Sequence, residues 1–146
     1  MKIYLDTCSL QRPLDDKLQP RIALEAEAIL TILSLCETGD ITLISSEILR
    51  FEVNRTPHPH RKTFVFEILA RATVEVALSD EIEERARDLQ GRGFKALDAL
   101  HLASAEAEHV DYFCTSDDRF LKRARMQSDI LPKIISPLEL AQEIVT

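Results

Sequence analysis

The chain has 146 residues, of which 45% are hydrophobic and 29% charged, and its formal net charge is −7. This length is sufficient for one domain with its own core, which we expect to span residues 1–146, and neither a membrane-spanning segment nor a signal peptide is indicated, so a cytoplasmic protein is expected. The negative charge argues against a nucleic-acid binder, unless bound divalent cations or local basic clusters offset it.

The first half of the chain alternates short apolar runs with helical patterns. Apolar runs rich in strand-forming residues predict buried strands, the first of which stops at Asp6. Apolar residues at steps of three and four predict helices, and Gly39 ends the first of them. In chain order we expect a strand over 3–5, a loop over 11–20, a helix over 21–37, a strand over 41–44, and helices over 47–54 and 61–70.

The second half continues this alternation. Residues 73–78 alternate apolar and polar side chains, which is typical of a half-exposed strand. Gly91 and Gly93 predict a sharp turn, and Pro137 suits the first position of a closing helix. In chain order we expect a strand over 73–78, helices over 79–89 and 96–108, a strand over 111–115, a basic helix after Asp118, a strand over 134–135 and a helix over 138–144.

Strands and helices that alternate along a whole chain predict an α/β fold. Helices that connect parallel strands must cross over the sheet and cover its faces. We therefore expect a three-layer α/β/α sandwich around a mostly parallel central sheet of about five strands.

Four acidic residues are expected at one edge of this sheet. Asp6 ends the first strand, Asp117 follows the fourth, Glu52 lies on the helix after the second, and Asp98 opens a helix. Parallel strands deliver their carboxyl ends to one edge, where ligands bind in open α/β folds. Clustered carboxylates repel one another unless a cation joins them, and oxygen-only sites suit Mg²⁺ or Mn²⁺. Each acid could instead be a helix cap or a first-turn residue, an alternative that fits Asp98 least well because its sequence neighbours are apolar.

Four sequence motifs in this order resemble the PIN domain family, and in particular the VapC-type toxins of bacterial toxin–antitoxin pairs. The matching segments, which span nearly the whole chain, are 4–9 (Tyr-Leu-Asp-Thr-Cys-Ser), 46–53 with Glu52, 97–103 (Leu-Asp-Ala-Leu-His-Leu-Ala) and 115–120 (Thr-Ser-Asp-Asp-Arg-Phe). Each motif is weak alone, whereas four of them at this order and spacing are a specific signal.

The resemblance implies that Asp6, Glu52, Asp98 and Asp117 form an acidic metal-binding and catalytic quartet. It also implies supporting roles for four neighbouring residues: Thr7, Ser9, Thr115 and Asp118. Glu47 is a less suitable substitute for Glu52, whereas Asp118 could share the role of Asp117 because the aspartate is doubled there. Gln11 and Arg12 depart from the family pattern, in which an asparagine is common in this loop.

The implied activity is metal-assisted hydrolysis of RNA phosphodiester bonds by the toxin of a type II toxin–antitoxin pair. The implied partners are an RNA substrate, a cognate antitoxin and a second copy of the chain. This mechanism needs no amino-acid nucleophile. The sequence shows no convincing Ser/His or Cys/His pair, and Cys8 has no histidine near it in sequence. Candidate contacts to the RNA backbone, each of which could equally be a solvated surface charge, are Arg12, Arg50, Arg55, Arg119, Lys122 and Arg123.

Two other functions fit a similar open sheet. One is a catalytically degenerate PIN-like domain that binds RNA or a partner, against which the four intact acids argue. The other is an aspartyl-phosphate enzyme or receiver. The phosphatases of this kind need a second aspartate two residues after the first, and Cys8 occupies this position. A receiver needs paired acids after the first strand, an acceptor aspartate after the third and a lysine late in the sheet, and none of these is evident.

Overall fold

The computed structural model describes residues 1–145 and contains a five-stranded sheet in the order β3-β2-β1-β4-β5. Every pair of neighbouring strands is parallel. The strands are β1 (Lys2–Leu5), β2 (Thr42–Ser46), β3 (Val74–Val76), β4 (Tyr112–Cys114) and β5 (Lys133–Ile135). The predicted sheet of about five mostly parallel strands is thereby confirmed, and the described strands are all parallel.

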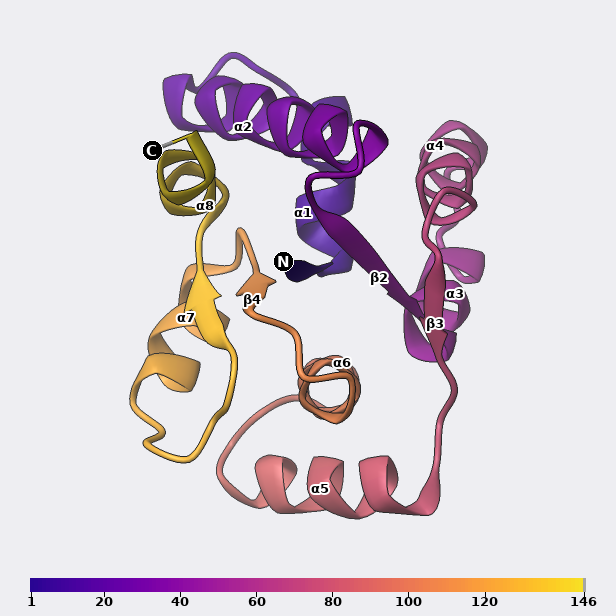
Figure 1. Ribbon diagram of the computed structural model, residues 1–146, viewed down its shortest axis with the longest axis vertical. Helices are drawn as coiled ribbons and strands as arrows, with labels where there is room; N and C mark the ends of the chain where they lie inside the picture. Colours follow the sequence, from indigo (N-terminus) through magenta and orange to yellow (C-terminus); the bar gives the residue numbers. More distant parts are fainter. Residues whose placement is uncertain (146) are drawn as a thin grey trace.

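Helices cover both faces of this sheet, which confirms the predicted three layers. They are α1 (Thr7–Gln11), α2 (Pro20–Glu37), α3 (Glu47–Asn54), α4 (Pro59–Leu69), α5 (Asp80–Gly91), α6 (Ala96–Ala107), α7 (Asp118–Arg125) and α8 (Pro137–Val145). Helices α2 and α8 lie on one side of the sheet and α6 on the other, with α5 packed on the outer side of α6 (Figure 1). None of the helices within residues 1–145 is long and apolar enough to span a bilayer.

The core is built around β1, the central strand. Ile3, Tyr4 and Leu5 are completely buried, as expected for a strand covered on both faces. The ring of Tyr4 stacks on Phe113 of β4 with centroids 5.2 Å apart, and Phe113 stacks on Phe120 of α7 at 5.1 Å. These aromatic contacts hold the beginning of α7 against the carboxyl ends of β1 and β4.

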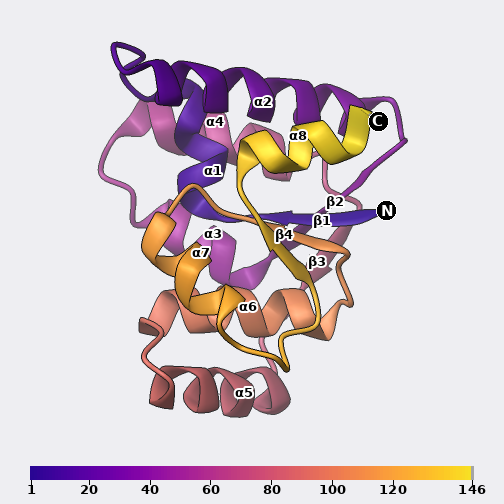
Figure 2. The ribbon, with the colours of Figure 1, turned by 90° about the vertical axis from the view of Figure 1, so that its left-hand side faces the viewer.

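The register between β1 and β4 brings the ends of both strands to the same level. Leu5 is paired with Cys114, and the backbone N–H of Asp6 donates to the carbonyl of Cys114 at 3.1 Å. In Figure 2, β1 runs from the N-terminus towards α1, and α1, α3 and α7 gather at that end of the sheet. This edge is the one where the sequence places the acids.

The prediction of a loop over residues 11–20 is wrong at its start. Helix α1 covers Thr7–Gln11 and a short 3₁₀ helix follows at Arg12–Leu14. A helix of five residues is too short to produce an apolar period, and what starts it is the side chain of Asp6, which accepts a hydrogen bond from the backbone N–H of Ser9. Helix α4 also begins earlier than predicted, at Pro59, because proline suits the first helical position.

Candidate active site

Asp6 lies in the turn between β1 and α1 and is 9% exposed. Its Oδ1 accepts hydrogen bonds from the backbone N–H of Ser9 at 3.0 Å and from the Sγ of Cys8 at 3.1 Å. Burial raises the pKa of Asp6 above its ordinary value, although hydrogen bonds from Thr115, Cys8 and Ser9 act in the opposite direction. The protein therefore holds a desolvated carboxyl group at the end of its central strand.

Asp117 occupies the corresponding place after β4. It is the N-cap of α7, and its Oδ1 accepts from the backbone N–H groups of Arg119 at 3.0 Å and Phe120 at 3.2 Å. The buried hydroxyl of Thr115 accepts from the backbone N–H of Asp117 at 3.1 Å, which fixes the turn between the strand and the helix. Thr115 and Ser9 thus bond to the chain next to the acids, and their supporting role stays a prediction.

Asp98 lies in the first turn of α6, which runs back towards the start of β4 and so begins at the carboxyl edge of the sheet. Its pKa is raised to about 6, first because the carboxyl group is largely buried and then because of the negative charges of Asp6, Asp117 and Glu52. Only carboxylates that lie near one another have this effect. Contacts between the elements agree with this: Thr7, next to Asp6, and His101, three residues after Asp98, both bond to Glu52, and β1 and β4 end at the same level. The elements that carry the four acids therefore meet at one edge of the sheet.

Glu52, on the second turn of α3, is held through one oxygen. Its Oε1 accepts hydrogen bonds from the hydroxyl of Thr7 and from Nε2 of His101, the latter at 3.0 Å. Burial acts to raise the pKa of Glu52, but the hydrogen bonds from His101 and Thr7 and the charge of Arg55 lower it below the ordinary value. Glu47 is directed elsewhere, since its Oε1 accepts from the backbone N–H of Leu78 after β3.

The chemistry of this donor set fits a hard divalent cation, because all four side chains offer carboxylate oxygens. Their positions are not those of a finished coordination sphere: within residues 1–145, no group of three or more His, Cys, Asp or Glu side chains is arranged to hold a metal ion. Carboxylates without a cation repel one another, and three of these four already bond to local N–H, S–H or O–H groups. Their role as metal ligands stays a prediction.

Asp118 forms a surface ion pair, whereas Asp117 lies at the site. Both of its oxygens accept from the guanidinium of Arg21, and its side chain is 66% exposed. This ion pair lowers the pKa of Asp118. The doubled aspartate of the sequence therefore divides into one residue at the site and one at the surface.

The candidate RNA contacts differ in how far they are neutralised. Arg12 pairs with the buried Glu25 at 2.9 Å, and Arg50 pairs with Glu75. Arg55 lies over the ring of Phe51, 5.4 Å from its centroid. The first two guanidinium groups are therefore structural ion-pair partners as well as surface charges.

The three candidates on α7 are exposed and form no ion pair with the described part of the chain. They line a hollow of about 460 Å³ whose lining residues are Arg92, Arg119, Lys122, Arg123, Met126 and Gln127. The side chain of Arg123 lies against the turn at Gly93, which has a φ of +101°, and donates to the carbonyl of Arg92 at 3.4 Å. This basic hollow begins one turn after Asp117.

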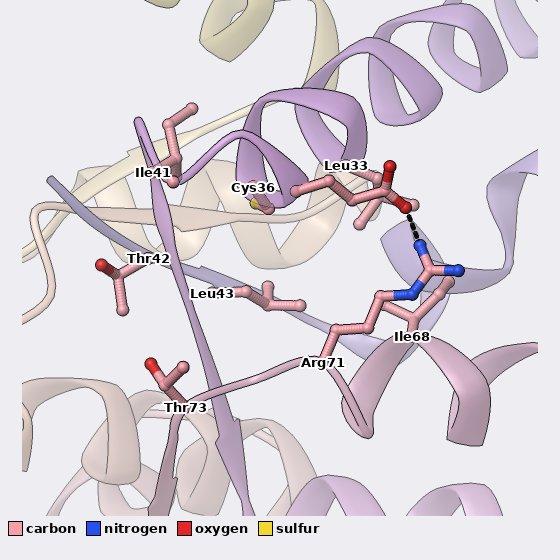
Figure 3. Close-up of a pocket in the computed structure, with 10 residues that line it drawn as sticks. Leu33, Cys36, Ile41, Thr42, Leu43, Ile68, Arg71 and Thr73 are labelled. Atoms are coloured by element: carbon pink, nitrogen blue, oxygen red, sulfur yellow. Dashed lines mark hydrogen bonds and ion pairs between the residues drawn. The ribbon is translucent and has the colours of Figure 1, made fainter.

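A larger hollow of about 600 Å³ lies at the opposite edge of the sheet (Figure 3). It is lined mainly by apolar side chains at the start of β2 and the ends of α2 and α4, including Leu33, Ile41 and Ile68. Arg71 and Glu37 form an ion pair there. None of the four acids contributes to this hollow, so its size does not identify it as the catalytic site.

Comparison with known families and structures was consistent with this geometry. The family model described as the PIN domain matches residues 3–126. The chain belongs to the PIN domain family. No curated protein matches this PIN domain.

Three solved structures share its fold. VapBC2 from Rickettsia felis, bound to a DNA fragment from its promoter, is 15% identical with a TM-score of 0.60, over 92% of this chain and 98% of that one. VapC20 from Mycobacterium tuberculosis, described as a Sarcin-Ricin loop cleaving toxin, is 17% identical with a TM-score of 0.54, over 81% and 92%. PAE2754 from Pyrobaculum aerophilum is 13% identical with a TM-score of 0.59, over 99% and 90%. At these identities the likeness is one of fold.

His101 lies inside a matching motif but was not among the site residues predicted from the sequence. Nor was Tyr4 connected with the site. His101 comes three residues after Asp98 on α6, a spacing that places two side chains on neighbouring parts of one helix surface. That spacing could have indicated that His101 lies near the site. It could not indicate the partners of His101, Glu52 and Tyr4, which are 49 and 97 residues away in sequence.

Proposed function

We propose that this PIN domain is a divalent-metal-dependent ribonuclease that hydrolyses phosphodiester bonds of RNA and acts as the toxin of a type II toxin–antitoxin pair. The observation that carries the proposal is the meeting of the elements that bear the four acids. Thr7, next to Asp6, and His101, on the helix of Asp98, both bond to Glu52. Asp117 caps α7 after β4, the strand beside β1. A cluster of acids at a sheet edge is unfavourable alone and becomes favourable with a cation.

The four acids would hold Mg²⁺ or Mn²⁺, which supplies an activated water and stabilises negative charge on the phosphate. The chain contributes orientation. The backbone N–H of Ser9 fixes Asp6, Thr115 fixes the turn at Asp117, and Thr7 holds Glu52. The Asp6 carboxylate accepts from the Cys8 thiol at 3.1 Å and disfavours the thiolate, so we propose water, not Cys8, as the attacking group.

The RNA backbone would approach along α7. Arg119, Lys122 and Arg123 offer cationic groups close to Asp117 in a chain whose net charge is −7. Phosphate contacts of this kind contribute affinity without sequence readout and weaken with salt. Arg12 and Arg50 are less suitable than the α7 residues as contacts for RNA phosphates, because each already neutralises a carboxylate.

A cognate antitoxin and a second copy of the chain are the proposed protein partners. The support is the fold shared with VapBC2 and VapC20, whose descriptions name a promoter-bound complex and a toxin. Co-expression with a small DNA-binding protein encoded next to this chain, followed by light scattering of the purified complex, tests both partners. A monomer that captures no such protein would contradict this part of the proposal.

The test of the activity is cleavage of single-stranded and structured RNA with Mn²⁺, compared with Mg²⁺ and with excess chelator. We expect cleavage with either ion, none with chelator, and none for Asp98→Asn, while Asp118→Asn serves as the matched control. Equal behaviour of wild type and Asp98→Asn would overturn the proposal. A protein that binds RNA but neither takes up Mn²⁺ in calorimetry nor cleaves would be the alternative, a degenerate RNA-binding module.

A further inference from the structure

We propose that His101 is a positioning residue that holds Glu52 in the orientation needed to bind a divalent cation, and that Tyr4 and Ser46 fix the imidazole ring of His101. This inference rests on the proposed nuclease function. It gives a positioning role to His101, Tyr4 and Ser46, which are not among the four acids and would not contact the RNA.

The contacts form one continuous buried chain. Nε2 of His101 lies 3.0 Å from Oε1 of Glu52, and its Nδ1 lies 2.7 Å from the hydroxyl of Tyr4. The same hydroxyl lies 2.7 Å from Oγ of Ser46. His101 is 2% exposed, and Tyr4 and Ser46 are completely buried, so bulk water does not compete for the bonds among these three residues. The side chain of Glu52, at the end of the chain of bonds, is 28% exposed.

The direction of each bond follows from the chemistry of its ends. An ionised carboxylate only accepts, so Nε2 of His101 carries the hydrogen that is donated to Glu52. With the neutral ring that we propose, Nδ1 is bare and accepts from the hydroxyl of Tyr4, whose oxygen then accepts from the hydroxyl of Ser46. The Oγ of Ser46 in turn accepts from the backbone N–H of Leu49 at 3.1 Å. Every hydrogen in the chain has an acceptor, and the last acceptor is Glu52.

This chain of bonds connects the three elements that carry the acids. Tyr4 belongs to β1, which ends at Asp6, and its ring is held by stacking on Phe113. His101 belongs to α6, which carries Asp98, and Ser46 is the N-cap of α3, which carries Glu52. The bond from His101 therefore sets the position of Glu52 relative to Asp98. The bonds to Glu52 from His101 and Thr7 both use Oε1, so the second oxygen, Oε2, is the one that would bind a divalent cation.

A buried polar chain could also serve stability alone, and two substitutions at His101 distinguish the roles. The side-chain amide of His101→Gln extends to the place of Nε2 and can still donate to Glu52. The amide of His101→Asn extends only to the place of Nδ1 and can still reach Tyr4. Each variant removes one of the two hydrogen bonds of His101, so a purely structural role predicts similar effects of the two variants on every measurement.

The main measurement is Mn²⁺ affinity by calorimetry, with thermal unfolding as the control for folding. We expect His101→Asn to bind Mn²⁺ roughly 10–100-fold more weakly than wild type, the range for loss of an outer partner of a metal ligand, and His101→Gln to stay within about fivefold. In a Glu52→Gln background, His101→Asn should cause no further loss, because its effect passes through Glu52. Equal losses for the two His101 variants, or a full further loss in the Glu52→Gln background, would overturn the proposal.

A second readout needs neither metal nor activity. The ¹⁵N shifts of the imidazole ring in the metal-free protein should show a hydrogen on Nε2 of His101, and Tyr4→Phe should change the shift of Nδ1 while leaving the fold intact. A neutral ring with its hydrogen on Nδ1 would overturn the proposal even if a His101 variant failed to fold. Failure of the nuclease function is recognised separately, because wild-type protein would then neither bind Mn²⁺ nor cleave RNA.

Discussion

Arg21 on α2 donates hydrogen bonds to both carboxylate oxygens of Asp118, with Nη1–Oδ2 at 2.7 Å and Nη2–Oδ1 at 2.6 Å. Asp117, the preceding residue, instead directs Oδ1 to the backbone of α7 and is one of the acids that raise the pKa of Asp98. Two adjacent aspartates thus have different tasks, one in attaching α7 to α2 and one at the site.

The first prediction compares these two aspartates. Asp117→Asn should lower RNA cleavage at least about 100-fold, since removal of one charged metal ligand costs several kcal/mol in the transition state. Asp118→Asn should change the rate only a few-fold, because Arg21 and Asp118 form an exposed pair. Initial rates at saturating Mn²⁺ provide the measurement. A larger loss for Asp118→Asn than for Asp117→Asn would contradict the assignment.

Arg12 and Arg50 provide a second comparison. Arg12 neutralises Glu25, whose side chain is 1% exposed, so Arg12→Ala leaves a buried carboxylate with only the more distant Arg21 at 3.6 Å. We expect a loss of about 3 kcal/mol in the free energy of unfolding. Arg50→Ala breaks an exposed pair with Glu75 and should cost less than about 1 kcal/mol. Urea unfolding of the two variants tests the difference, and equal midpoints would contradict it.

Metal removal provides the third prediction. A cation that binds the folded chain at a concentration 100 times its Kd adds about 2.7 kcal/mol to the free energy of unfolding. We therefore expect Mn²⁺ to raise the Tm by roughly 5–10 °C and a chelator to reverse the shift. Asp98→Asn should unfold at a higher temperature than wild type without metal, because one repelling charge is gone, and should lose the Mn²⁺ shift. A shift that persists in Asp98→Asn would place the ion elsewhere.

The fourth prediction concerns pH and a group far from the site. Asp129 accepts hydrogen bonds from Arg92, which lower its pKa to about 2. An unfolded aspartate has a pKa near about 3.9, so between these values the unfolded chain binds more protons. The stabilisation from this pair is therefore present above about pH 4 and is lost as the pH falls towards 2. The difference in urea midpoint between wild type and Asp129→Asn should shrink from pH 6 to pH 3, and a constant difference would contradict this.

The order of elements and the gathering of the acids were predictable because both depend on local patterns. Apolar runs fix which segments are strands, and parallel strands must end at a common edge. Helix α1 was not predictable from periodicity, because its first-turn contact is a single cap from Asp6. The pairing of Arg21 with Asp118 was hidden for a different reason. The two residues lie 97 positions apart, and no spacing rule connects them.

The role of His101 shows the same limit. The motif that contains His101 could be recognised in the sequence. The proposed role of His101 depends on its contacts with Tyr4 and Glu52, which only the folded chain brings to its two ring nitrogens. The division of the arginines into ion-paired and exposed groups was likewise not predictable from the sequence, since Glu25 and Glu75 are brought to Arg12 and Arg50 by tertiary packing.

The central place of β1 in the sheet has a consequence for synthesis. The first strand to leave the ribosome pairs on one side with β2, but its other neighbour, β4, begins at Tyr112. The nascent chain therefore carries an open strand edge for most of its translation, a state prone to mispairing. If translation stalls or ends before Tyr112, β1 can pair only with β2, and its other edge stays unpaired.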